Sequence, residues 1–262
     1  MINAHKVTSI MVFAAACVLA GNFQLPALMY TALHGAYGLC WCSKYLTTPD
    51  KSFETPVNSV GEFAVAYAIL NVLYWTGGLV MIATGGSNRL GGVALGWPAD
   101  AAALVSGGAY GVQVAVATFA YTIGMCVSTP WTGHSLPHSL TRSLPHSLAH
   151  SRYLHFAGDA QKFFTLKYKP RALITEGLFS RSRNINYLGE MLIYSAFALV
   201  ANNAWLVLAN LLMWTTLFRA NMMKKDASLA RYPGFAEYKE RSNLLLPKLF
   251  GRGDSDDGAK KL

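Results

Sequence analysis

The sequence predicts an all-α protein, a polytopic membrane helix bundle with about six spans and a C-terminal helical hairpin. Only 13% of its 262 residues are charged and 53% are hydrophobic, whereas about a quarter of the residues of a soluble domain are charged. Uncharged apolar runs also recur along the chain, and a spanning helix needs about 20 such residues. Both observations indicate that much of the surface faces lipid.

The apolar runs give the expected spans in chain order. They cover residues 7–20, 25–42, 60–84, 101–127 and 188–218. The last run is long enough for two short helices and carries Asn202 and Asn203 at its middle. We therefore expect a hairpin there, with a tight turn at the two asparagines.

The basic residues predict the orientation of the bundle. Of the 22 Lys and Arg residues, 8 fall in 128–187 and 10 in 219–262. The positive-inside rule places both segments in the cytosol. We expect an integral, multi-pass membrane protein, located in the endoplasmic reticulum if the cell is eukaryotic. Nucleic-acid binding is excluded, because the chain offers no soluble basic domain for it.

The chain is expected to have four parts. Residues 1–127 hold N-terminal helices on the substrate side, 128–155 form a His/Ser/Leu/Pro loop, 156–250 form a C-terminal domain and 251–262 a disordered tail. The loop contains an eight-residue unit written twice, SLPHSLTR and SLPHSLAH. Its histidines allow a metal site, but a duplicated, proline-broken loop without metal is the stronger interpretation.

A polar cluster stands at the edge of the hairpin, in the stretch GLFSRSRNINYLGE at 177–190. Arginine forks bind phosphates or carboxylates bidentately, and Asn186 and Glu190 share one helix face because they are four residues apart. A belt of snorkelling arginines is the alternative. Asn and Glu are costly at a membrane boundary unless they are used, so we expect a polyanionic cofactor here.

Two further clusters are expected beside the first. Lys224, Lys225, Asp226, Tyr232, Tyr238 and Arg241 follow the second hairpin helix, and Asp159, Gln161 and Lys162 precede the first. A hairpin returns its end beside its start, so the three clusters would form one cytosolic mouth for a dinucleotide. No Rossmann glycine motif follows a strand.

These motifs resemble the C-terminal domain of the membrane steroid 5-alpha-reductase family, including its uncharacterised branch. The block GLF, six residues, then NYLGE is similar to the family's GLF and NFLGE, and Tyr232, Pro233 and the segment NLLLPKLF match its closing motifs. Sterol C14 reductases and isoprenylcysteine or phospholipid methyltransferases share the architecture. Many of these carry Arg-His-Pro-x-Tyr-x-Gly, where this chain has Arg183-Asn184-Ile185-Asn186-Tyr187-Leu188-Gly189. The missing His-Pro favours the reductases over the methyltransferases.

The resemblance implies a bound NADPH, with S-adenosylmethionine as the alternative cofactor. The residues that it implies for cofactor binding are Lys162, Arg183, Asn186, Tyr187, Glu190, Lys224, Asp226, Tyr232, Tyr238 and Arg241. The role given to Lys224 rests on an alignment with the family, and a shift of that alignment by one residue would give the role to a neighbouring residue.

The candidate catalytic residues lie in HGAYGLCWCSK, at 34–44. His34, Tyr37, Trp41 and Lys44 have helical spacing and line one face. Ionisable groups inside a membrane helix usually face the bundle interior. A double-bond reductase needs a proton donor, which Tyr37 or His34 would supply, with Lys44 beside them. Alternatively, Tyr37 and Trp41 are interface aromatics and Lys44 marks the cytosolic end.

The expected activity is NADPH-dependent reduction of a double bond in a sterol- or isoprenoid-like lipid, with the lipid held in the apolar bundle. An S-adenosylmethionine-dependent methyltransferase is one alternative. A non-catalytic membrane protein on the same scaffold is the other. The number of basic residues favours a phosphate-bearing cofactor.

Overall fold

A computed structural model describes residues 2–48, 59–85, 89–90, 93–94, 117–118, 121 and 154–248. Its long elements are the helices α1 (Ile2–Ala20), α2 (Leu25–Thr47), α3 (Val60–Ala83), α7 (Leu154–Tyr168), α8 (Ile185–Ala201), α9 (Ala204–Met213), α10 (Arg219–Leu229) and α11 (Phe235–Arg241). The predicted all-α class is confirmed, except for a short antiparallel pair that the sequence did not indicate. This pair joins β1 (Arg89–Leu90) to β2 (Val93–Ala94). The predicted span at 101–127, apart from three positions, the repeated loop at 135–150 and the tail at 251–262 lie outside the described residues.

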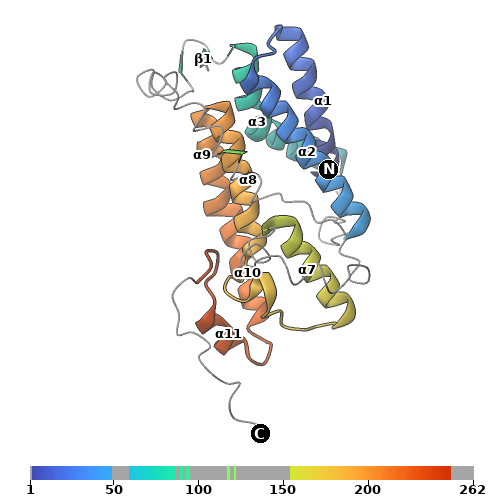
Figure 1. Ribbon diagram of the computed structural model, residues 1–262, viewed down its shortest axis with the longest axis vertical. Helices are drawn as coiled ribbons and strands as arrows, with labels where there is room; N and C mark the ends of the chain where they lie inside the picture. Colours follow the sequence, from blue (N-terminus) through green and yellow to red (C-terminus); the bar gives the residue numbers. More distant parts are fainter. Residues whose placement is uncertain are drawn as a thin grey trace, which may run out of the picture.

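The helices form two groups along the long axis of the molecule (Figure 1). Helices α1, α2 and α3 pack together beside the half of the α8–α9 hairpin that contains its turn. Helices α7, α10 and α11 gather around the opposite end, where α8 begins. Across the parts of the chain that are described, none of the helices combines the length and apolar character that crossing a membrane requires. The number of spans therefore stays a prediction.

The predicted hairpin is present, and its turn falls at the two asparagines. Asn202 ends α8 in the left-handed conformation, with φ 48°. Asn203 then caps α9, because its side-chain oxygen accepts a hydrogen bond from the backbone N–H of Trp205 at 3.0 Å. Asn is the non-glycine residue best suited to the left-handed region and is also a preferred N-cap. Adjacent asparagines thus stop one helix and start the next.

The second helix of the hairpin continues well past the apolar run. Helix α9 passes through a π-helical turn, η4 (Trp214–Phe218), directly into α10. The chain therefore returns along α8 and carries α10 to the level where α8 begins (Figure 1). This path places the polar segment after Phe218 beside the polar segment before Ile185.

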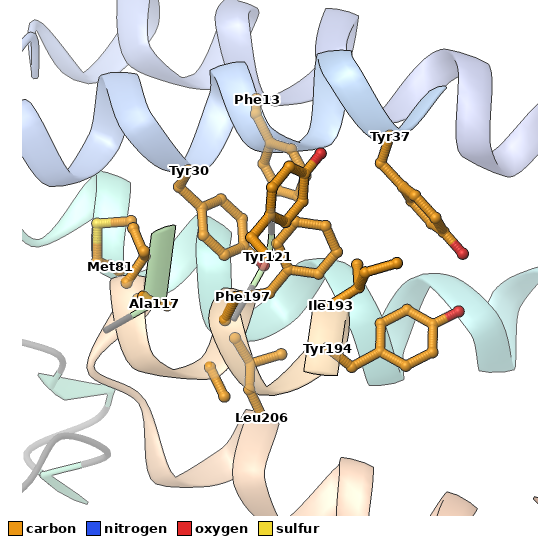
Figure 2. Packing of buried hydrophobic residues seen from close by; sticks show 14 of the residues in the cluster. Phe13, Tyr30, Tyr37, Met81, Ala117, Tyr121, Ile193, Tyr194, Phe197 and Leu206 are labelled. Atoms are coloured by element: carbon orange, nitrogen blue, oxygen red, sulfur yellow. The ribbon is translucent and has the colours of Figure 1, made fainter. Parts of the chain in front are cut away.

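Aromatic side chains dominate the core, which lies between α1–α3 and α8 (Figure 2). Close helix approaches at two adjacent glycines make this packing possible. A Cβ on Gly78 would lie 2.2 Å from the ring of Tyr30, and one on Gly77 would lie 2.4 Å from Leu206. Both glycines thus let α3 approach α2 and α9 closely.

Candidate functional site

Arg183 is the centre of the polar end of the hairpin, although its side chain is only 5% exposed. Its Nε and Nη2 donate to the carboxylate of Asp226 at 2.9–3.1 Å. Its Nη1 donates to the carbonyl oxygen of Ser242 at 2.6 Å and to its hydroxyl at 3.2 Å. The guanidinium therefore ties α8, α10 and the end of α11 together. We call the region around the Arg183–Asp226 ion pair the mouth.

The segment after α11 lies along the start of α8 and closes one side of the mouth. The backbone N–H of Arg183 donates to the carbonyl of Asn243 at 3.0 Å, and the Asn243 N–H donates to the carbonyl of Arg181 at 3.1 Å. The side chain of Asn184 donates to the carbonyl of Leu244 at 2.9 Å. The two sequence motifs GLFSRSRN and NLLLP, some 60 residues apart, thus form one structural unit.

Gly177 begins the turn that leads into the mouth and adopts φ +60°. Gln161 of α7 holds this turn, because it donates to the carbonyl of Glu176 at 2.8 Å and accepts from the N–H of Leu178 at 3.0 Å. A Cβ on Gly177 would lie 2.6–3.0 Å from the amide of Gln161. The first position of the GLF motif therefore needs glycine, because the backbone there is left-handed and because a Cβ would collide with Gln161.

We expect Gly177→Ala to lower the free energy of unfolding by about 2–3 kcal/mol, combining left-handed strain with the collision against Gln161. Gly21→Ala is the matched control, because Gly21 has φ +61° and no atom lies within 4 Å of its added Cβ. The control should cost only the backbone strain, about 1 kcal/mol. Denaturant titration of both variants measures the difference, and equal losses would exclude the role given to Gln161.

Lys225, and not Lys224, points into the mouth. Its Nζ donates to the carbonyl oxygen of Arg183 at 2.7 Å and lies 5.1 Å from the ring centroid of Phe179. Lys224 is exposed on the outer side of α10. The structure thus gives the inward position to the neighbouring lysine, which belongs to the predicted cluster but was not among the residues predicted to bind the cofactor.

The charge of Lys225 is sensitive to pH near neutrality. Burial, and then the positive charge of Lys162 on α7, lower the pKa of Lys225 from 10.5 to about 8. Asp159 and Asp226 act in the opposite direction, and Arg183 adds to the lowering. Two ammonium groups from different helices therefore face the same place, an arrangement that a bound anion would stabilise.

A second ion pair joins the mouth to the N-terminal helices. Lys44 of α2 forms a salt bridge with Asp159 of α7, and their side chains are 7% and 12% exposed. The other oxygen of Asp159 accepts a hydrogen bond from Asn186 Nδ2 at 3.1 Å. Asn186 lies in the first turn of α8, so α2, α7 and α8 meet at this carboxylate.

Glu190 lies one helical turn beyond Asn186, facing the aromatic core. Its Oε1 accepts a hydrogen bond from the hydroxyl of Tyr194 at 2.7 Å and another from the hydroxyl of Tyr37 at 3.5 Å. The rings of Tyr37 and Tyr194 come from α2 and α8, and their hydroxyl oxygens lie on the same side of the core cluster (Figure 2). The hydroxyl of Tyr194 also accepts from Lys6 Nζ of α1, at 2.7 Å.

His34 has different surroundings from Tyr37, although both were predicted as proton donors. Its Nδ1 lies 3.0 Å from the carbonyl oxygen of Tyr30. Since a carbonyl only accepts, Nδ1 carries the hydrogen and Nε2 of the neutral ring carries none. The ring stacks on Phe197, with centroids 3.8 Å apart. This geometry favours a packing role for His34 and leaves Tyr37 as the better proton donor.

The remaining predicted residues surround the mouth without meeting at one point. Tyr238 is buried and donates to the carbonyl of Phe179 at 2.7 Å, and burial raises the pKa of its hydroxyl to about 12. Arg241 is exposed and reaches the carbonyl of Thr175 at 3.4 Å. Two further tyrosines make ring contacts: Tyr187 packs against Phe218 and Tyr232 lies beside Arg231.

In the comparison with protein families, a family model matches residues 150–242. The matching family is described as "Protein of unknown function (DUF1295)" and is associated with the steroid 5-alpha-reductase superfamily. The matched region contains α7, α8, α9, α10 and α11, and so most of the mouth. No curated protein and no solved structure matches the chain significantly.

Sequence reasoning missed Lys6 and Tyr194. Lys6 comes directly before the first apolar run, where it is easily taken for a boundary charge. Tyr194 lies four residues after Glu190 and therefore shares its helix face. That spacing was a usable signal, whereas the position of Lys6 depends on how α1 packs against α2 and α8.

Proposed function

We propose that this protein is a membrane-embedded reductase that uses NADPH to reduce a carbon–carbon double bond in a sterol- or isoprenoid-like lipid. The observation that carries the proposal is the position of Glu190. It binds the hydroxyl of Tyr37 inside an aromatic core, one helical turn from Asn186 at the polar mouth. A proton donor for an apolar substrate and a site for a charged cofactor are thereby neighbours on α8.

Exposed apolar side chains support contact with lipid. On α1 and α2, Leu19 is 88% exposed, Leu46 79% and Leu39 73%. On the outer face of the hairpin, Leu208, Leu211 and Leu212 are exposed as well. The three leucines of α9 have helical spacing and therefore share one face, and an exposed apolar face marks a binding or membrane-facing region. A lipid substrate would enter the bundle from such a surface.

The donor set at the mouth fits a phosphate-bearing cofactor. Lys162 and Lys225 bring two positive charges together from α7 and α10, and the exposed Arg241 adds a third cation near the edge. Arg183 would act as a support, because Asp226 and Ser242 occupy its fork. Asn186 would orient the cofactor at the point where the mouth meets the core.

Reduction then requires one hydride and one proton. NADPH supplies the hydride when it is bound. The hydride would add to one carbon of the double bond with its own electron pair. Tyr37 would break its O–H bond and give the proton to the other carbon, where the two π electrons of the double bond form the new C–H bond. The surrounding core would exclude water, and Glu190 would hold the hydroxyl of Tyr37 in place.

The proposal predicts saturable NADPH binding to detergent-purified protein, and Lys225→Met should weaken it about 10- to 100-fold. The loss corresponds to one charge-assisted hydrogen bond, about 1.5–3 kcal/mol. Lys224→Met is the matched control, because it removes the same charge from the exposed neighbouring position and should change the affinity by less than about twofold. Above pH 8 the wild-type affinity should fall by up to about tenfold per pH unit as Lys225 loses its proton.

The pH dependence separates a direct contact from an effect on folding. In Lys225→Met, the affinity should no longer fall between pH 7 and 9. Equal effects of the two lysine variants would remove Lys225 from the site. Binding of S-adenosylmethionine in place of NADPH would support a methyltransferase, and binding of neither by folded protein would support a non-catalytic role.

A further inference from the structure

Lys6 is buried inside the helix bundle, 7% exposed, on the face of α1 that meets α2 and α8. Its Nζ lies 4.4 Å from the ring centroid of Tyr37, 4.9 Å from that of Tyr194 and 5.5 Å from that of Trp41. The ammonium borders a small cavity with room for about one water molecule. An ammonium in such a place is costly unless a negative charge compensates it.

The hydrogen bonds from Lys6 run in one direction. An ammonium only donates, so the hydroxyl of Tyr194 accepts from Lys6 at 2.7 Å. The hydrogen of Tyr194 is then directed to Glu190 Oε1, also at 2.7 Å. A carboxylate that accepts from two tyrosine hydroxyls is the form that suits this geometry. Lys6 and Glu190 are therefore the two charges of one ion pair, bridged by a hydroxyl.

We infer that Lys6 is the internal counter-ion of Glu190, and that it acts through Tyr194 to hold this carboxylate in position. Lys6 is thus a positioning residue. Lys6 has a second effect, which rests on the proposed reductase function. When Tyr37 gives up its proton, the negative charge left on its oxygen faces the Glu190 carboxylate at 3.5 Å, and the Lys6 ammonium, 4.4 Å from the Tyr37 ring centroid, offsets that repulsion.

The groups around Lys6 leave Glu190 as its partner. On α1, His5 is engaged with Asn71, with its Nδ1 2.9 Å from the amide oxygen. On α2, Lys44 is paired with Asp159. Tyr74 of α3 contributes its ring, 5.5 Å from Lys6 Nζ. Among the described residues that face Lys6, Glu190 is the carboxylate that interacts with it electrostatically.

The inference is tested on purified protein without cofactor or substrate. The infrared spectrum of Lys6→Met should gain a shifted carboxylate stretching band, because Glu190 loses its counter-ion and the Lys6–Tyr194 hydrogen bond that supports it. The band should disappear in Lys6→Met/Glu190→Gln and be absent in Lys6→Arg, which keeps the charge. No new band in Lys6→Met, or a band that survives Glu190→Gln, would overturn the inference.

Thermal unfolding gives a second readout in case Lys6→Met does not fold. Lys6→Met should lower the melting temperature by roughly 10 °C, the effect of leaving one member of a buried pair uncompensated. The double variant, which carries neither charge, should recover most of that loss, or restore folding. A double variant no more stable than Lys6→Met would contradict the pairing. Failure of NADPH to bind, with these results intact, would overturn the proposed function and leave the ion pair.

Discussion

Arg183→Ala should destabilise the folded protein by about 3–5 kcal/mol, because it leaves the carboxylate of Asp226 buried without its partner. The substitution also removes the bonds to the carbonyl and hydroxyl of Ser242. Three elements of the mouth would lose their common contact at once. Denaturant unfolding of the detergent-solubilised protein measures the loss, with the midpoint and slope determined separately.

Arg181→Ala is the control for this change. Arg181 lies two residues earlier on the same segment, is exposed, and takes part in the mouth through its backbone carbonyl. Its side chain should therefore be dispensable to within about 0.5 kcal/mol. A loss for Arg183→Ala no larger than that for Arg181→Ala would show that the ion pair does not hold the mouth together.

Local sequence signals were enough to predict the helical hairpin. An apolar run too long for one helix, with two adjacent asparagines at its middle, leaves a turn as the simplest solution. The structure places the turn at Asn202 and Asn203. The extent of α10 was also accessible in principle, because no proline or glycine interrupts the chain between Ala204 and Leu229.

The inward-facing residues of the mouth could not be fixed in the same way. Lys224 and Lys225 are identical in type and adjacent, so only the rotation of α10 about its axis decides which one reaches Arg183. That rotation follows from the unbroken path through the π-helical turn η4, which shifts the phase of the helix relative to an α-helix. A sequence pattern of charges has no means of showing this shift.

Long-range pairing was the other limit. The sequence placed basic and acidic clusters near each other but did not pair Arg183 with Asp226, or Lys44 with Asp159. For both Arg183 and Lys44, the sequence offered several carboxylates near the expected mouth as possible partners. Helix packing selects among them, through contacts such as the close approach of Gly158 on α7 to Asn186, where an added Cβ would lie 3.4 Å from the Asn186 Cβ.

Asp159→Ala should have the second large effect, also about 3–5 kcal/mol, because it leaves the buried ammonium of Lys44 without its carboxylate. Asn186 would lose the acceptor of its side-chain hydrogen bond at the same time. Since α2 carries Tyr37 and α8 carries Glu190, this contact fixes the relative position of the two residues on which the proposed chemistry depends. Unfolding experiments should therefore be combined with NADPH titration.

Two comparisons make the result specific to the ion pair. Glu176→Ala removes a carboxylate from an exposed position and should cost less than about 0.5 kcal/mol. Lys44→Met/Asp159→Ala removes both charges and should recover most of the stability, because a buried pair can be replaced by apolar groups at little cost. If the double variant is as unstable as Asp159→Ala, the loss comes from the contact with Asn186, and the link between the mouth and the core runs through α8 alone.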